Sequence, residues 1–238
     1  MPAVGGFTTR VGGTSDAPWS AANLALHTGD EWDRVHVNRD LLAKKFGLSY
    51  RDLVFGRQVH GTGVRVVEHV SARARDRGLP DTDALVTTVP GIALVMMGAD
   101  CPPVLLADPS AGVVGVAHVG RQGLACGVLV ETVRVMAEQG ARAASIQAVV
   151  GPGVCGRCYE VPAQLADEVE QLAPGSRSTT RSGAPSIDLA AGAVAQLHRL
   201  GVPTVSTVGG CTMEQTELFY SYRQQGLTGR HAGIVVLR

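Results

Sequence analysis

The stretch from Ile92 to Gly120 reads IALVMMGADCPPVLLADPSAGVVGVAHVG and contains three apolar runs. These runs cover residues 92–97, 104–107 and 113–117, and glycine, proline and polar residues separate them. Each run has the length of a strand, and its continuous apolar character is typical of strands buried on both faces. The Gly and Pro residues between the runs predict turns. The stretch therefore predicts neighbouring strands in the core of a sheet.

Further apolar runs predict more strands, at residues 64–67, 84–87, 146–150, 202–208 and 234–237. Apolar residues at helical spacing predict helices at 33–46, 124–138, 161–172 and 189–200. Asp188 is placed to cap the last helix, and Gly47, Gly140 and Gly201 each follow a helix as C-terminal glycines do.

Strands cluster in the middle of the chain and helices bracket them, without a regular βαβ alternation. The pattern predicts an α+β fold, with residues 1–238 forming a single domain that has a mixed central β core flanked by helices. The segment Pro174–Pro185, rich in Ser, Thr, Gly and Arg, is predicted to be a surface loop. No Walker-type loop and no Gly-x-Gly-x-x-Gly after a strand are present, which argues against a P-loop or dinucleotide-binding enzyme.

The charge balance restricts the classes of partner. Lys plus Arg and Asp plus Glu are 21 each, so the basic excess that general nucleic-acid or acidic-membrane binding requires is missing. We find no secretory signal pattern at the N-terminus and no apolar run that approaches the roughly 20 residues of a membrane span. Five cysteines, an odd number, do not indicate a disulfide framework. We expect a cytoplasmic protein, in which cysteines more often bind metal or act in catalysis.

Three segments each place a metal-ligating residue beside turn-forming residues. They are Gln58–Gly61 with His60, Gly98–Pro103 with Cys101, and Gly115–Gly120 with His118. Pro102 restricts Cys101 to extended backbone, and a hairpin-like return of the chain would bring Cys101 and His118 to the same sheet edge.

Two imidazoles and one thiolate leave the fourth position of a tetrahedral Zn²⁺ site open, which is typical of catalytic rather than structural zinc. Such an ion can activate a water molecule or polarise a substrate oxygen. Asp83 and Asp100 are candidates to orient the ligands. The spacing alone also allows histidines that bind no metal, because a histidine after a strand is more often only hydrogen-bonded.

At these residues the chain resembles a known family. Its members are called YfiH/YlmD-type proteins, laccase-like multicopper polyphenol oxidases, purine nucleoside phosphorylases or peptidoglycan editing factors. The matching motifs run nearly from end to end: Phe7–Ser15, Asn23-Leu24, Val37–Arg39, Gln58–Gly61, Thr82–Thr87, Ala99–Val104, His118-x-Gly120, Gly151-Pro152, Cys158–Val161, Asp188-Leu189, Cys211-Thr212, Ser221–Arg223 and Gly229-Arg230.

The resemblance implies that His60, Cys101 and His118 bind Zn²⁺. It also implies phosphorolysis of adenosine, inosine, guanosine and methylthioadenosine, with an adenosine deaminase side activity. The expected partners are therefore purine nucleosides and phosphate, with no nucleic acid and no membrane, and the protein is expected to be a monomer or a small homo-oligomer. With Cys101, His60 and His118 we expect Asp83 in the catalytic set, as a candidate proton-transfer group.

The expected substrate- and phosphate-binding residues are Arg10, Asn23, Arg39, Arg121, Arg223 and Arg230. Arginine suits bidentate phosphate binding, although each of these arginines could instead pair with a carboxylate. One motif departs from the family: His-Ala-Gly-Trp-Arg-Gly is His118-Val119-Gly120-Arg121-Gln122-Gly123 here. The positive charge has moved by one position, which puts the affinity and selectivity of this chain in question.

Three alternatives remain open. Copper-dependent polyphenol oxidation needs a trinuclear cluster, and seven histidines without a His-x-His pair argue against it. A Cys–His thiol hydrolase would use Cys101 as nucleophile and His118 as base without any metal. A peptidoglycan-precursor editing role is compatible with nucleoside chemistry, and the residues do not separate the two.

The remaining cysteines carry a separate expectation. Cys155-Gly156-Arg157-Cys158 is a single Cys-x-x-Cys, and no second one exists in the sequence. Because Cys126 and Cys211 also stand alone in the sequence, we predict a structural turn here rather than a metal or redox pair.

Overall fold

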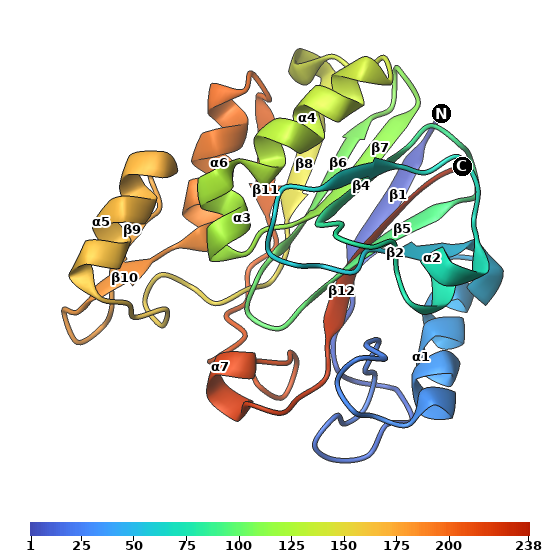
Figure 1. The fold of residues 1–238 in the computed structure, drawn as a ribbon, viewed down its shortest axis with the longest axis horizontal. Helices are drawn as coiled ribbons and strands as arrows, with labels where there is room; N and C mark the ends of the chain where they lie inside the picture. Colours follow the sequence, from blue (N-terminus) through green and yellow to red (C-terminus); the bar gives the residue numbers. More distant parts are fainter.

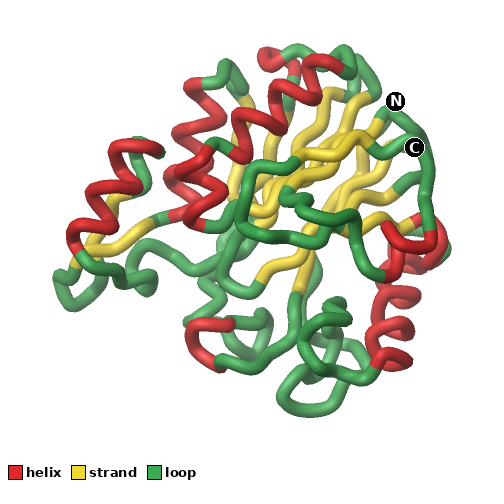
Figure 2. Tube along the Cα trace, viewed as in Figure 1, coloured by secondary structure: helices red, strands yellow, loops and turns green.

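Two mixed β-sheets pack against each other in the centre of the molecule, and helices cover their outer faces (Figure 1). The structure is a computed structural model and describes residues 1–238. The smaller sheet has four strands in the order β1-β12-β5-β2, and the larger has six in the order β11-β8-β6-β7-β4-β3. Figure 2 shows the strands together in the middle, with helices around them. The predicted α+β fold with a mixed central β core is confirmed.

The strands of the smaller sheet are β1 (Ala3–Phe7), β2 (Leu53–Phe55), β5 (Ala93–Gly98) and β12 (His231–Leu237). Those of the larger sheet are β3 (Val64–Val66), β4 (Ala84–Thr87), β6 (Pro103–Asp108), β7 (Val113–His118), β8 (Gln147–Val150) and β11 (Thr204–Thr207). A separate hairpin consists of β9 (Arg177–Thr179) and β10 (Pro185–Ile187). The helices are α1 (Trp32–Lys45), α2 (Ala72–Asp76), α3 (Arg121–Cys126), α4 (Val128–Glu138), α5 (Ala163–Leu172), α6 (Leu189–Arg199) and α7 (Tyr222–Gln225).

The strands are continuously apolar because each sheet packs against the other sheet on one face and against helices on the other. In β5, Leu94 and Met96 point into the core between the sheets, whereas Val95 belongs to the core under α1. In β6, Leu105 faces the other sheet and Leu106 faces the core under the helices. Since successive side chains of a strand point to opposite faces, a strand with a core on each side must be apolar throughout.

The helices divide between the two outer faces. Helix α1 packs through Leu42 and Ala43 onto the smaller sheet, and α4 and α6 pack through residues such as Met136 and Leu197 onto the larger one. The result is a layered order of helix, sheet, sheet and helix.

The predicted elements agree with the structure in most places. All eight predicted strands and all four predicted helical segments are present, and the Asp188 carboxylate caps α6 by accepting from the backbone N–H of Ala191. The segment 124–138 is not one helix: Gly127, at φ +90°, separates α3 from α4. The prediction of a plain surface loop at Pro174–Pro185 is wrong, because β9 and the start of β10 pair there as an antiparallel hairpin.

The chain crosses between the sheets three times near one end of the molecule. The crossing segments are 56–63 between β2 and β3, 99–102 between β5 and β6, and 208–230 between β11 and β12. Hydrogen bonds hold these segments: the Gln58 amide pairs with the backbone of Met97, near the end of β5, at 2.7 and 3.0 Å, and Thr212 Oγ1 donates to Asp100 at 2.7 Å. This end of the sandwich therefore collects residues from distant parts of the sequence.

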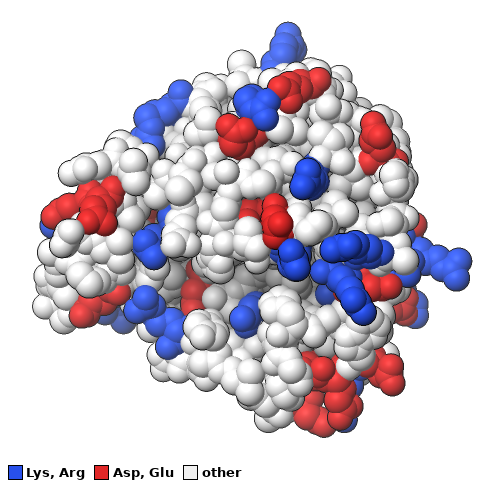
Figure 3. Space-filling view, in the orientation of Figure 1, with Lys and Arg blue, Asp and Glu red and all other residues white.

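Two further observations concern the surface. None of the helices combines the length and the apolar character needed to span a bilayer. Basic and acidic side chains are interspersed over the face in Figure 3, with one basic group gathered beside α2, where Arg57, Arg73 and Arg77 line a pocket of about 560 Å³.

A buried histidine makes the stability depend on pH. His231 is fully buried at the start of β12, beside the rings of Phe219 and Tyr220. Burial, helped by the charge of Arg230, lowers the pKa of His231 to about 4. Between pH 6.5 and 4 the unfolded chain binds a proton that the folded chain does not, so the free energy of unfolding falls as the pH falls, by about 3 kcal/mol in total.

We expect His231→Gln to flatten this dependence in urea-unfolding experiments between pH 7 and 4.5. The matched control is His69→Gln, since His69 is exposed and its replacement should leave the slope unchanged. Equal slopes for wild type and His231→Gln would contradict the assignment.

Candidate functional site

The structure brings the side chains of His60, Cys101 and His118 together at the end of the sandwich where the chain crosses between the sheets. Their ligand atoms, imidazole nitrogens and a thiol sulfur, all lie within 4.8 Å of one another. His60 lies on the crossing after β2, Cys101 on the crossing after β5, and His118 is the last residue of β7. His118 is buried, Cys101 is partly buried and His60 is exposed, so the cluster opens toward solvent on the His60 side.

The pairing of β6 with β7 accounts for the meeting of Cys101 and His118. In this antiparallel pair Pro103 lies opposite His118, which puts Cys101 just beyond the end of the ladder. The backbone N–H of Val119 donates to the carbonyl of Pro102 at 3.1 Å and extends the pairing past the strand. The hairpin predicted from the sequence therefore exists.

Asp83 connects two of the three ligands and has no exposed surface. One carboxylate oxygen lies 2.9 Å from Nδ1 of His118 and accepts from the backbone N–H of His60 at 2.9 Å. The other oxygen accepts from the N–H groups of Gly61 at 2.9 Å and Val59 at 3.2 Å. Since Nδ1 of His118 is engaged, Nε2 remains for a metal ion, the usual arrangement of a carboxylate behind a metal-ligating histidine.

The same contacts set the charge of Asp83. Burial alone would raise its pKa, but the hydrogen bonds from His118, Gly61 and Val59 outweigh burial and lower it. Asp83 is therefore held as a carboxylate by its neighbours, which favours a positioning role over proton donation.

Backbone conformation at two positions is unusual for residues other than glycine. His60 has φ +62° and Asp100, next to Cys101, has φ +95°. Left-handed conformations cost energy for side chains with a Cβ and tend to persist where surrounding contacts fix them. At His60 the contact is the bond to Asp83. At Asp100, the two carboxylate oxygens accept from Thr212 Oγ1 and from the backbone N–H of Arg223, each at 2.7 Å.

Gly120 lies directly against all three ligands. A Cβ at this position would approach His60 Cδ2 to 2.7 Å, Cys101 Sγ to 3.3 Å and His118 Cε1 to 3.5 Å. Only a residue without a side chain leaves the ligands where they are. Gly120 was not among the site residues predicted from the sequence, although its place two residues after His118 was a signal that could have identified it.

The thiol and imidazole of the site influence each other's protonation. Burial opposes charge on Cys101, but the hydrogen bonds and charges of His118 and His60 lower the pKa of its thiol to about 6. Burial likewise opposes charge on His118, and its contacts with Asp83 and Cys101 raise its pKa to about 9. At neutral pH both shifts favour a thiolate on Cys101, which is the form of cysteine that binds a metal.

Three of the predicted anion-binding arginines lie on segments that adjoin the cluster. Arg121 begins α3 immediately after Gly120 and is partly exposed. The guanidinium of Arg223 lies over the ring of Tyr159 at 4.6 Å and donates to the carbonyl of Glu160 at 3.4 Å. Arg230 is half-buried and donates through Nη1 to the carbonyls of Thr228 and Gly229, each at 2.9 Å. Burial lowers its pKa, and the charges of Asp100 and Cys101 act in the opposite direction.

The other three predicted binding residues make more hydrogen bonds to the chain itself. Arg10 donates to the carbonyls of Ser20 and Thr216, each at 2.7 Å. Arg39 is buried over the ring of Phe55, and its guanidinium donates to the carbonyls of Leu24, Arg75 and Asp76.

Asn23 has no exposed surface, and its amide bonds to Ala25, Thr28, Asp30 and the backbone of Arg230. These contacts show how Arg10, Asn23 and Arg39 hold loops in place, a role that their residue types alone did not reveal.

Comparison with known proteins gives one family and a consistent set of relatives. Residues 4–238 match the family described as "Multi-copper polyphenol oxidoreductase laccase". A relative from Streptomyces coelicolor, named purine nucleoside phosphorylase SCO2081, is 47% identical over 98% of this chain and 94% of its own length. Purine nucleoside phosphorylase YlmD from Bacillus subtilis is 32% identical over 99% of this chain and 88% of its own length.

A solved structure agrees with the sequence relatives. The crystal structure of YlmD from Geobacillus stearothermophilus superposes with a TM-score of 0.92 at 31% identity, covering 99% of this chain and 92% of that one. Because the match spans nearly the whole chain in sequence and in fold, this protein belongs to the laccase-like YfiH family described as multi-copper polyphenol oxidoreductase laccase.

Proposed function

We propose that this chain is a zinc-dependent purine nucleoside phosphorylase and that residues 1–238 act as one catalytic domain. The observation that carries the proposal is the convergence of His60, Cys101 and His118, with Asp83 behind His118. The relatives named purine nucleoside phosphorylase, at 32% to 47% identity, support the reaction class. We propose adenosine, inosine, guanosine and methylthioadenosine as substrates, adenosine deamination as a side activity, and a monomer or small homo-oligomer as the active form.

The donor set fits Zn²⁺. Two imidazoles and one thiolate are borderline to soft ligands, and zinc bound by three protein groups keeps a place for a substrate or water molecule. When bound, the ion supplies Lewis-acid chemistry to an oxygen at that place. His118 contributes Nε2, since Asp83 occupies its Nδ1.

Phosphorolysis needs phosphate beside C1′ of the nucleoside. An oxygen of phosphate forms a bond to C1′, the N-glycosidic bond breaks, and the base leaves with the electron pair and takes up a proton. Of the arginines considered, Arg121, Arg223 and Arg230 are the ones we propose for binding phosphate, because guanidinium groups bind its oxygens in pairs. The backbones of Arg121 and Arg223 adjoin the cluster, at Gly120 and Asp100, and the charge of Cys101 acts on Arg230.

We assign Asp83 a positioning role. Its two oxygens are fully engaged by His118 and by the backbone of the His60 loop, which leaves no oxygen to exchange a proton with a substrate. Its effect on the reaction is to fix the ring orientation of His118 and the left-handed backbone of His60.

One alternative has an observation in its favour. The lowered pKa of Cys101 beside His118 is also what a metal-free Cys–His nucleophile pair requires. The two functions differ in their response to chelation: a thiol hydrolase keeps its activity, whereas the proposed enzyme loses it. The family description suggests copper-dependent oxidation. That function predicts copper in protein purified without added copper, whereas the proposed enzyme predicts zinc.

The primary test is base release from adenosine and inosine, followed with and without phosphate. We expect release to require phosphate, to stop after removal of metal by a chelator and to return when Zn²⁺ is added back. Metal analysis of the same preparation should find zinc rather than copper. Release that continues in the complete absence of phosphate, or no release from any purine nucleoside, would overturn the proposal.

Replacing Asp83 tests the positioning role. Asp83→Asn keeps the shape but presents an NH₂ group to donors that now bond a carboxylate, so we expect zinc affinity to fall about 10- to 100-fold, in line with other residues behind metal-ligating histidines. The measurement is competition with a chromogenic chelator. Asp81→Asn is the matched control, since Asp81 is an exposed neighbour paired with Arg57. The zinc affinity of this variant should equal that of wild type.

Replacing Gly120 tests the space at the ligands. In Gly120→Ala the new Cβ would meet His60 Cδ2 at 2.7 Å and push that ring away, so we expect a loss of zinc affinity of about tenfold or more with little loss of folding. Gly209→Ala is the control, because a Cβ there meets nothing within 4 Å. Wild-type zinc affinity in Gly120→Ala would show that His60 is not a ligand.

A further inference from the structure

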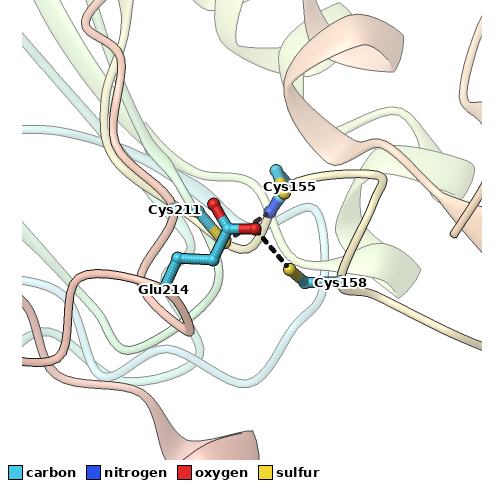
Figure 4. A group of neighbouring side chains, drawn as sticks. All are labelled: Cys155, Cys158, Cys211 and Glu214. Atoms are coloured by element: carbon cyan, nitrogen blue, oxygen red, sulfur yellow. Dashed lines mark hydrogen bonds between the residues drawn. The ribbon is translucent and has the colours of Figure 1, made fainter. Parts of the chain in front are cut away.

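A second cluster of metal-ligating side chains lies away from His60, Cys101 and His118. Cys155, Cys158, Cys211 and Glu214 each contribute one atom, and these atoms lie within 4.8 Å of one another (Figure 4). All three cysteines are free thiols in the structure. Cys211 therefore does not stand alone, as the sequence suggested, and the expectation that Cys155-x-x-Cys158 is only a structural turn has to be revised.

The cluster comes from two short turns at the ends of neighbouring strands. Cys155 and Cys158 follow β8, and Cys211 and Glu214 follow β11. Because β8 and β11 pair in parallel, their carboxyl ends reach the same edge of the sheet. Each turn presents its two ligands three residues apart, so Cys211-x-x-Glu214 is the second pair that a search for Cys-x-x-Cys alone does not find.

Backbone hydrogen bonds shape both turns. The N–H of Cys158 donates to the carbonyl of Cys155 at 2.9 Å, and the N–H of Glu214 donates to the carbonyl of Cys211 at 3.1 Å. The two turns are joined as well, since the N–H of Thr212 donates to the carbonyl of Gly153 at 3.2 Å. The ligands are therefore held near one another by the backbone and do not depend on chance contacts of side chains.

The side-chain contacts also resemble those of a metal site. The backbone N–H of Cys155 lies 3.5 Å from Cys211 Sγ, and Cys158 Sγ lies 3.3 Å from Glu214 Oε1. Three thiolates and a carboxylate exceed the charge of a divalent ion by two units, and Arg181, paired with Glu214 at 2.6 Å, offsets part of this excess.

We propose that Cys155, Cys158, Cys211 and Glu214 bind a structural Zn²⁺, distinct from the ion proposed at His60, Cys101 and His118. Four protein ligands close a tetrahedral site, and Zn–S bonds of about 2.3 Å place the sulfurs about 3.8 Å from one another. Since no two ligand atoms are more than 4.8 Å apart, no pair has to approach by more than about 1 Å. Cys211 is buried, Cys155 and Cys158 are half-buried and Glu214 is exposed, so the ion would be shielded on its three-sulfur side and reach solvent at Glu214.

The second ion would stabilise the first site from behind. Val154, beside Cys155, donates its N–H to the carbonyl of Asp100 at 2.8 Å, and Thr212, beside Cys211, donates its hydroxyl to the Asp100 carboxylate. Both turns therefore contact the residue that precedes Cys101. Joining them through zinc restrains the backbone of Asp100, whose φ is +95°.

The test uses the full chain purified under reducing conditions without added metal. We expect about two Zn²⁺ per chain in wild type and about one in Cys158→Ser, in Glu214→Gln and in His60→Ala. Cys126→Ser is the matched control, because Cys126 is exposed and outside both clusters, and it should keep the wild-type content. The decisive variant is His60→Ala with His118→Ala, in which only the second site remains.

Cobalt separates the two sites spectroscopically. The double histidine variant loaded with Co²⁺ should show the strong thiolate charge-transfer absorption of a three-sulfur site, whereas Cys211→Ser, with only the one thiolate of Cys101 in its intact site, should show much weaker absorption. In the double histidine variant, activity reports on the site at His60, Cys101 and His118, whereas bound metal reports on the second site. The two proposals can therefore fail independently.

Three results would overturn the proposal. The first is a double histidine variant that folds, as judged by circular dichroism, yet binds neither Zn²⁺ nor Co²⁺. The second is a mass-spectrometric finding that two of the three cysteines form a disulfide in the reduced preparation. The third is a Cys158→Ser variant with the full wild-type zinc content. If Cys211→Ser fails to fold, the cobalt spectrum of the double histidine variant and the zinc content of Glu214→Gln still decide the question.

Discussion

The carboxylate of Asp83 is the interaction on which the candidate site depends. It is buried without any exposed surface and receives three backbone N–H groups from the His60 loop together with Nδ1 of His118. A buried carboxylate without these donors would be costly, and the loop without the carboxylate would leave three N–H groups unpaired. The carboxylate supplies the acceptor for the loop and the loop supplies the donors for the carboxylate. As a result, ligands from two sheets meet at one point.

The layered architecture explains why this point lies where it does. The central strands β5, β12, β6 and β7 have a core on both faces, so they have no room for ionisable side chains in their middle. The ends of these strands and the connections between them are free to carry such residues, and three connections meet at one end of the sandwich. A metal-binding cluster at the crossings is thus the natural consequence of a sheet pair that is apolar throughout.

How much of this could be predicted from the sequence differs by residue. The strands around Cys101 could be identified because strand-length apolar runs bounded by Gly and Pro are typical of doubly buried strands, and the hairpin that joins Cys101 to His118 followed from them. Strand β2 was not identified, because its apolar run, Leu53–Phe55, is only three residues long, whereas each predicted strand rested on a run of at least four residues. The break at Gly127 was missed because the apolar spacing continues across it, while the backbone turns left-handed for one residue.

The functional residues divide along a similar line. His60, Cys101 and His118 could be named from their residue types and from the resemblance, and the structure adds the geometry. Arg39 and Asn23 show the limit of sequence-based prediction. The guanidinium of Arg39 is buried over Phe55 and the amide of Asn23 is hydrogen-bonded within its own loop, and residue type alone does not distinguish such side chains from those that contact a ligand. Which atoms a polar group satisfies is a property of the fold, and the sequence does not state it.

The placement of the crossings has a consequence for how such a molecule can vary. The β9–β10 hairpin and the segment around α2 lie on stretches that begin and end on the sheets, away from the residues that join Asp83 and Asp100 to their partners. Such stretches can lengthen or shorten without shifting a ligand, whereas one residue inserted within β6 or β7 would turn the side chains beyond it to the opposite face of the sheet. Tolerance to length changes should therefore be very uneven along this chain, with the most rigid spacing between Ile92 and Gly120.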